Sequence, residues 1–229
     1  MTLVIAVKSC QKDLEAGAHN VIRSTWGADA KGTGIDVRFF VGASNTPKYE
    51  QDEVHVKCDD SYIALPYKTR EICRWVMGKK VDNLLLCDTD TYLMIKYVLT
   101  SGFEKWDYFG SFRCWAPREI RRYEHADPNG VSEIIEQCFS YASGGRGYFL
   151  SRAAASEIAD TTPTSWCEDV WVGQVLGPLI AENKLTVEST LNNSYTGNQY
   201  AVHFEGRWNG NPPYDPKSGW MEETHKAYG

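Results

Sequence analysis

The sequence lacks the features that define several large classes of protein. Its seven cysteines are an odd number without a CxxC pair or a regular spacing, so we expect reduced thiols and no disulfide framework. No run approaches the roughly 20 apolar residues of a membrane span. The apolar run at 3–7 is too short for a secretory signal. We therefore expect a soluble, cytoplasmic protein with no membrane segment in this chain.

Positive charge is also scarce, since the net charge is −6. A nucleic-acid-binding protein usually carries a basic balance or a basic stripe, so we expect no nucleic-acid partner. The one basic run, Arg113 to Arg122, is short and is interrupted by Trp115 and Pro117. It is either a solvated loop or a lid that meets an anionic ligand.

What the sequence does contain suits one globular domain. The chain has 229 residues, of which 42% are hydrophobic, and it has no internal repeat or linker. The 8 Trp and 13 Tyr are many for this length. Aromatic rings serve as core material, and they also stack on the C–H faces of sugars. We predict a single domain spanning 1–229.

Short apolar runs alternate with helix-like segments, most clearly over residues 1–90. We predict strands at 3–7, 37–41, 54–56, 84–87, 108–112 and 148–150, and helices at 13–26, 60–80, 151–158 and 168–180. Asp60 or Ser61 is a candidate cap of the second helix. Turn residues lie at 127–130 and 144–147, and the tail from Asn192 is predicted to be loop. This order predicts a mostly parallel α/β sheet that binds ligands at the carboxyl ends of its strands.

Three constellations are candidates for chemistry. Asp88-Thr89-Asp90 follows the apolar strand at 84–87, where two carboxylates can reach one divalent cation or simply cap a turn. Glu168-Asp169 begins an apolar helix, so the pair either suits the helix dipole or supplies a general base in Asp169. His203 is either a structural histidine or a metal ligand beside Asp90, and imidazole favours Mn²⁺ over Mg²⁺.

Five segments occur in one order over about residues 3 to 205 and together resemble one superfamily. They are Lys8-Ser9 with Ile22-Arg23-Ser24-Thr25-Trp26-Gly27; Asp60-Ser61-Tyr62 with Leu65, Lys68-Thr69 and Trp75; Cys87 to Leu93; Tyr141 to Ser151; and Glu168 to Gly173. This set is similar to the β1,3-galactosyltransferase/N-acetylglucosaminyltransferase and Fringe superfamily.

The resemblance implies a GT-A fold, which is a Rossmann-like fold for nucleotide-diphospho-sugar transferases. It would have a donor-binding half at about 1–112 and a smaller, irregular acceptor-side half at about 113–229. The implied reaction is inverting, metal-dependent transfer from a UDP-sugar to a hydroxyl of a glycan or glycoprotein, with Mn²⁺ (or Mg²⁺) as cofactor. Asp169 would be the general base. Asp90 and His203 would bind the metal, with Asp88 in the metal shell or against the ribose.

The resemblance also implies the remaining site residues. The donor site would contain Lys8, Ser9, Arg23, Asp60, Lys68, Asp88, Thr89, Gly144 and Gly145, whereas Glu168 and Trp166 would lie on the acceptor side. Thr89 replaces the middle acid of the superfamily motif, and Arg146 is an extra bulky residue in the glycine turn. The membrane anchor, stem and disulfides of Golgi members are missing, which suits a viral or microbial enzyme.

Two other classes of function remain open from the sequence. A phosphatase of the haloacid dehalogenase type also places Asp-x-Asp after an apolar strand, although usually after the first strand. A UDP- or sugar-binding module that has lost catalysis would explain Thr89 and Arg146. Asp88, Asp90 and Asp169 together favour the transferase.

Overall fold

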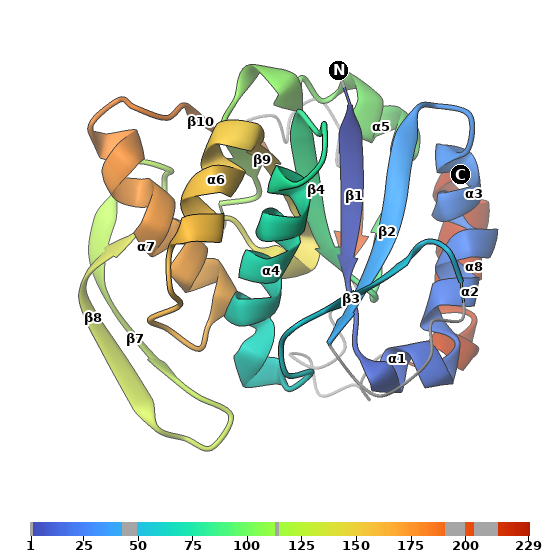
Figure 1. Cartoon of the computed structure of the whole chain (residues 1–229), viewed down its shortest axis with the longest axis horizontal. Helices are drawn as coiled ribbons and strands as arrows, with labels where there is room; N and C mark the ends of the chain where they lie inside the picture. Colours follow the sequence, from blue (N-terminus) through green and yellow to red (C-terminus); the bar gives the residue numbers. More distant parts are fainter. Residues whose placement is uncertain (1, 43–49, 113–114, 191–199, 204–214) are drawn as a thin grey trace.

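A computed structural model describes residues 2–42, 50–112, 115–190, 200–203 and 215–229. Its centre is a seven-stranded sheet in the order β10-β6-β9-β4-β1-β2-β3 (Figure 1). The strands are β1 Leu3–Lys8, β2 Ile35–Gly42, β3 Glu53–Val56, β4 Asn83–Asp88, β6 Tyr108–Gly110, β9 Tyr148–Ser151 and β10 Val187–Ser189. β9 runs antiparallel to β4 and β6, and the other neighbours pair in parallel. The predicted mostly parallel α/β sheet, and with it the GT-A fold class, is confirmed.

Helices cover both faces of this sheet because its strands are apolar on both sides. On β4, Leu84 and Leu86 pack into one core, whereas Leu85 and Cys87 pack into the other. The first core lies under α4 Leu65–Met77, α6 Arg152–Asp160 and α7 Glu168–Ala181. The second lies under α2 Ala18–Ser24, α3 Trp26–Ala30, α5 Ile95–Thr100 and α8 Trp220–Tyr228 (Figure 1).

The prediction of one continuous first helix is wrong. Residues 13–26 do not form one helix, because Gly17 adopts a left-handed backbone with φ +88° and ends α1 Gln11–Ala16. A second break falls at Thr25, so α2 and α3 follow as separate short helices. Gly27 lies inside α3 rather than ending a helix.

The cap predicted for the second helix is also wrong. The 3-10 turn η1 Tyr62–Ala64 precedes α4, and neither α4 nor η1 has a side-chain cap. Asp60 instead accepts hydrogen bonds from Gln11, Gly42 and Lys68. The cap at Ser151 is present, since its hydroxyl accepts from the Ala154 N–H and begins α6.

The second half of the chain is more regular than its composition predicts. β7 Ile120–Ala126 and β8 Ser132–Phe139 form an antiparallel hairpin around the predicted turn at 127–130, and it projects beside α7 (Figure 1). β5 Thr91–Leu93 pairs with β11 Ala201–His203. Within the described residues, the other 3-10 turns are η2 Phe103–Lys105, η3 Gly144–Arg146 and η6 Pro216–Ser218. The tail predicted to be loop therefore contains β11 and α8.

Two expectations about covalent and membrane features can be compared with the structure. The six cysteines that lie within the described residues are all free, as predicted. Within the same residues, no helix is long and apolar enough to cross a membrane.

Candidate active site

Two of the predicted site residues, Lys8 and Asp88, end the parallel strands β1 and β4, whose carboxyl ends lie at the lower edge of the sheet in Figure 1. β1 ends at Lys8, and β4 ends at Asp88 in the next strand of the sheet, in register with Lys8. The turn η3 and the start of α7 lie against the same place. The sequence thus brings together segments that are up to 160 residues apart, as the Lys8–Glu168 contact shows.

A buried ion pair between Lys8 and Glu168 forms the centre of the site. Lys8 Nζ donates to Glu168 Oε2 at 3.1 Å and lies 3.3 Å from Asp88 Oδ1. Glu168 also accepts from Thr69 Oγ1 at 2.8 Å and from the Tyr148 hydroxyl. Lys8 and Glu168 are each only 5% exposed. Glu168, predicted on the acceptor side, therefore lies at the buried centre with its carboxylate fully engaged.

The charge states of this pair follow from its partners. Burial alone lowers the pKa of Lys8, but the carboxylates of Asp88, Glu168 and Asp169 outweigh burial and raise it well above its usual value. Burial raises the pKa of Glu168, but Lys8 and the hydrogen-bonding neighbours outweigh it and lower the pKa overall. The pair is therefore an ammonium and a carboxylate.

Asp169 lies next to this pair with a contrasting electrostatic environment. Burial and then the adjacent Glu168 carboxylate raise the pKa of Asp169 well above the ordinary value for an aspartate. Its carboxylate accepts from the Gly144 N–H. A Cβ at Gly144 would overlap Asp169 Oδ1 and lie 2.9 Å from Glu168 Oε2. Gly144 thus leaves space for the two carboxylates, so its lack of a side chain is required by protein packing.

The Asp88-Thr89-Asp90 turn is tied down at its middle residue. Thr89 Oγ1 donates to Asp13 Oδ2 of α1 at 2.8 Å, so the residue that departs from the superfamily motif fixes the turn. Asp13 was not among the predicted site residues, and nothing in its sequence context distinguished it. The carboxylates on either side of Thr89 stay accessible, with Asp88 30% and Asp90 28% exposed.

Asp90 and His203 lie close together, and their predicted role as metal ligands stays a prediction. His203 Nδ1 lies 3.4 Å from Asp90 Oδ1, and pairing of β11 with β5 sets this approach. A Cβ at Gly145 would lie 2.7 Å from His203 Nε2, so Gly145 also serves close packing. Among the described residues, no group of three or more acidic, His or Cys side chains is arranged to hold a metal ion. A carboxylate and an imidazole nevertheless suit Mn²⁺, and ions shared with a diphosphate take few protein ligands.

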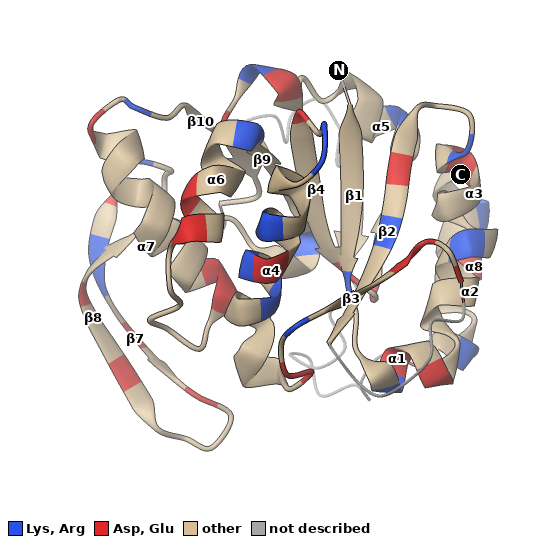
Figure 2. Cartoon of the chain, in the orientation of Figure 1, with Lys and Arg blue, Asp and Glu red and all other residues tan. Residues whose placement is uncertain are grey.

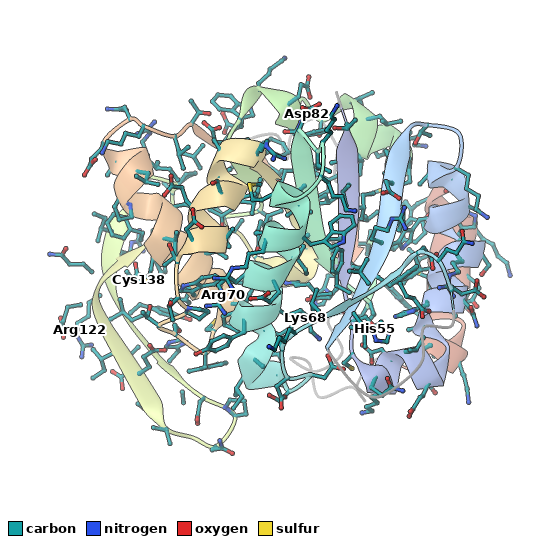
Figure 3. The ribbon with its side chains drawn as sticks, viewed as in Figure 1. His55, Lys68, Arg70, Asp82, Arg122 and Cys138 are labelled. Atoms are coloured by element: carbon teal, nitrogen blue, oxygen red, sulfur yellow. The ribbon has the colours of Figure 1, made fainter. Side chains whose placement is uncertain are left out.

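Asp60 and Lys68 form a clamp below the ends of β1 and β2. Asp60 accepts from the Gly42 N–H at 2.6 Å, from the Gln11 N–H at 2.9 Å and from Lys68 Nζ at 2.6 Å. Lys68 Nζ also donates to the Ser9 carbonyl, and Figure 3 shows Lys68 on α4 close to β3. This clamp fixes the loop that follows Lys8.

Ser9 and Arg23 belong to a buried network that leads away from the carboxylates. Ser9 Oγ lies 2.7 Å from His19 Nε2, and His19 Nδ1 lies 3.2 Å from Glu53 Oε1. Arg23 binds Glu53 at 3.1 Å and Asp52 at 2.6 Å. These contacts join Arg23 to Ser9 through Glu53 and His19, and not to Lys8 or Asp88. Its predicted place in the nucleotide site stays a prediction.

Two pockets of the described residues lie away from the carboxylates of the site. A pocket of about 380 Å³ opens between the end of β3 and α4, lined by Lys57, Cys58, Asp59, Ser61, Ile63, Ala64 and Tyr67. None of the predicted site residues lines it. Arg23 lines a separate pocket of about 150 Å³ beside β2.

The galactosyltransferase family model matches residues 18–186 of this chain, which is well over half of its length. The chain therefore belongs to the galactosyltransferase family, and the protein is a glycosyltransferase. This confirms the resemblance and the enzyme class, and it leaves the phosphatase alternative without support. The family implies a sugar donor and a glycan acceptor. No curated protein matches the chain.

Three solved structures are similar to this chain at low sequence identity. A glycosyltransferase involved in the glycosylation of the major capsid of PBCV-1 is 12% identical, with a TM-score of 0.47, covering 99% of this chain and 100% of that one. HddC from Yersinia pseudotuberculosis is 11% identical with a TM-score of 0.42, covering 82% and 89%. A197 from STIV is 13% identical with a TM-score of 0.39, covering 83% of each. These likenesses are loose, so the family assignment rests on the family match.

Proposed function

We propose that this glycosyltransferase moves a sugar from a UDP-sugar to a hydroxyl of a glycan or glycoprotein, with inversion at the anomeric carbon. The observation that carries the proposal is the convergence of Asp88, Asp90, Lys8 and Asp169 where β1 and β4 end and α7 begins. The acidic side chains lie on both sides of a buried ammonium. On one side they can bind the metal ion that accompanies a diphosphate, and on the other side a carboxylate can accept a proton.

Asp169 is the proposed general base. Its neighbours Glu168 and Gly144 fix its position beside the buried Lys8–Glu168 pair. It accepts the proton of the acceptor hydroxyl as the new C–O bond forms and the bond to UDP breaks. Trp166 lies on the acceptor side, three residues before it in the chain.

The opposite side of the site is proposed to hold the donor. Mn²⁺ or Mg²⁺, bound by Asp90 and His203 with Asp88 nearby, would supply positive charge to the diphosphate leaving group. Lys8 adds a permanent positive charge there, and Lys68 with Asp60 holds the loop that carries Ser9. Thr89, Gly144 and Gly145 complete the donor side, while Arg23 supports Ser9 through Glu53 and His19.

The experiment is a screen of UDP-sugars, beginning with UDP-galactose, for release of UDP with Mn²⁺, with Mg²⁺ and with a chelator. We expect metal-dependent turnover in the wild type and loss of Mn²⁺-dependent UDP binding in Asp90→Ala, measured by calorimetry. Asp36→Ala is a suitable control, since Asp36 is a partly exposed residue of β2 that pairs with Arg38. Unchanged UDP binding in Asp90→Ala would remove the metal site from the proposal.

A further inference from the structure

We infer that the β7–β8 hairpin builds a subsite for the acceptor: Trp166 and Tyr62 pack against the C–H face of an acceptor pyranose, and His125 and Glu133 of the hairpin hold Trp166 in position. This inference rests on the proposed function. It adds the acceptor's chemical class, a pyranoside recognised through its apolar face, and two positioning residues that no motif contains.

A row of aromatic rings runs from the surface near α4 to the hairpin. The ring centroids of Tyr62 and Trp166 lie 6.2 Å apart, and those of Trp166 and His125 lie 4.9 Å apart in a stacked arrangement. His125 in turn lies 5.2 Å from Tyr123. Tyr62 is 53% exposed and Trp166 is partly exposed, so the outer end of the row is open to a ligand. Aromatic faces of this kind bind apolar faces of ligands.

The open end of the row lies at the catalytic carboxylates. Trp166 is in the segment that leads into α7, and Asp169 follows in its first turn. The Tyr62 ring, in the 3-10 turn that precedes α4, lies beside Trp166. α4 is the helix whose Thr69 hydroxyl donates to Glu168, the residue before Asp169. A pyranose on Tyr62 and Trp166 would therefore present its hydroxyls toward Asp169.

Trp166 also has an unused hydrogen-bond donor. Its indole Nε1–H is buried and has no partner among the residues that the structure describes. Buried polar groups normally have a partner, from the protein, from water or from a ligand. A sugar has an apolar face that can stack on the indole ring and a hydroxyl that can accept from its Nε1–H.

The hairpin fixes the segment on both sides of Trp166. His125 Nε2 lies 2.7 Å from Glu133 Oε2, and the same oxygen accepts from Ser165 Oγ at 2.8 Å. Ser165 Oγ in turn accepts from the Cys167 N–H at 3.2 Å. One carboxylate therefore couples the ring that stacks on Trp166 to the backbone that precedes α7.

The hairpin also supplies a matched control. Glu136 lies on the same strand, β8, but its side chain is 74% exposed and forms an ion pair with the exposed Arg122. Figure 3 shows Arg122 at the outer edge of the hairpin, and Figure 2 shows charges of both signs along it. Glu133→Gln and Glu136→Gln thus make the same chemical change at two positions. Glu133 contacts His125 and Ser165, whereas Glu136 is exposed to solvent.

The test compares two reactions of the full chain with the UDP-sugar that it hydrolyses best. The first is hydrolysis of the donor without acceptor. The second is transfer to the best of four methyl pyranosides (galactoside, glucoside, mannoside and N-acetylglucosaminide), with glycerol as an acyclic acceptor. For Glu133→Gln we expect acceptor KM to rise about three- to tenfold, the range for one lost hydrogen bond. Hydrolysis and donor KM stay at wild-type values, and Glu136→Gln matches the wild type.

Variants at Trp166 and His125 separate positioning from general packing. Trp166→Ala should raise acceptor KM more than Trp166→Phe, because Phe keeps an aromatic face. His125→Phe should retain more pyranoside transfer than His125→Ala for the same reason. Transfer to glycerol should be unaffected by any of them, since glycerol has no ring to stack. A melting temperature for each variant identifies any that fail to fold, and the remaining variants decide the result.

Two results would overturn the subsite and leave the proposed function intact. One is equal acceptor KM values for Glu133→Gln and Glu136→Gln. The other is a wild type that transfers to glycerol but to no pyranoside. A wild type that neither hydrolyses nor transfers any UDP-sugar would instead refute the proposed function, and the subsite would fall with it.

Discussion

Replacing Lys8 by Met tests the buried ion pair at the centre of the site. Methionine keeps the length and apolar stem of lysine but removes the ammonium that lies 3.1 Å from Glu168 and 3.3 Å from Asp88. The Glu168 carboxylate would remain buried without a positively charged partner, and the side chains of Thr69, Tyr148 and Asp169 would be its hydrogen-bond partners. An uncompensated buried carboxylate is strongly destabilising.

The magnitude follows from the burial of both partners. Breaking a buried pair by removing one member costs about 3–5 kcal/mol in the free energy of unfolding. For a domain of this size each kcal/mol shifts Tm by roughly 2–4 °C, so we expect Tm to fall by about 6–20 °C. Urea unfolding followed by circular dichroism measures the free energy directly. Lys12→Met, at an exposed position, should change it by less than about 0.5 kcal/mol.

The pH dependence gives an independent check. Glu168 has a folded pKa below its usual value, so its ionisation stabilises the wild type above about pH 4.3 and is lost as pH falls through the folded pKa. The raised pKa of Lys8 keeps its contribution fully present at every pH below about 10.4. Without Lys8, burial raises the pKa of Glu168. The deficit of Lys8→Met should therefore shrink as pH falls from 7 to 4.

A double-mutant cycle with Glu168→Gln completes the experiment. We expect the double variant to be about 1–3 kcal/mol more stable than the sum of the single effects predicts, because neither charge is then left alone. A loss below about 1 kcal/mol for Lys8→Met at pH 7, with no change on acidification, would refute the electrostatic reasoning.

Three further variants follow from the same contacts. Asp169→Asn should lower the rate of transfer by about 10²–10⁴. It should also raise Tm at pH 7, because the folded pKa of Asp169 is above its usual value and its ionisation therefore costs stability as pH rises. A lower Tm in scanning fluorimetry would contradict this. Gly144→Ala places a Cβ on the Asp169 carboxylate and should lower kcat about tenfold, whereas Gly78→Ala, with 3.4 Å to its nearest neighbour, should not. Asp60→Asn weakens a charged clamp and should cost about 1.5–3 kcal/mol in urea unfolding, well above the effect of Asp59→Asn at the adjacent exposed position.

The sheet could be predicted from sequence where burial on both faces makes a strand continuously apolar. The strands at 3–8 and 83–88 are such runs, and both lie in the middle of the sheet. β7 and β8 were not predicted, because their side chains are largely exposed or only partly buried and their apolar residues do not alternate regularly along the sequence. The break at Gly17 was missed because a glycine inside a helical pattern does not by itself announce a left-handed backbone.

The types of residue in the candidate site could be predicted from the sequence, but the contacts between them could not. Asp88, Asp90 and Asp169 stand out because each follows a strand or begins a helix. That Lys8 would bind Glu168, 160 residues away, depends on strand order and on the seating of α7, and no local pattern encodes either. Asp60 shows the opposite error, since a helix cap was its local interpretation and tertiary contacts with Gly42 and Lys68 replaced it.

The short ladder between β5 and β11 means that a mutation outside the proposed metal ligands can separate them. Successive side chains of a strand point to opposite faces, so sliding this three-residue pairing by one position would turn His203 away from Asp90. Tyr200 prevents such a slide, because its carbonyl accepts from the Met94 N–H at 2.8 Å and its hydroxyl donates to the Gly147 carbonyl at 2.9 Å. A change at Tyr200 would therefore uncouple the two proposed metal ligands while leaving both of them unaltered.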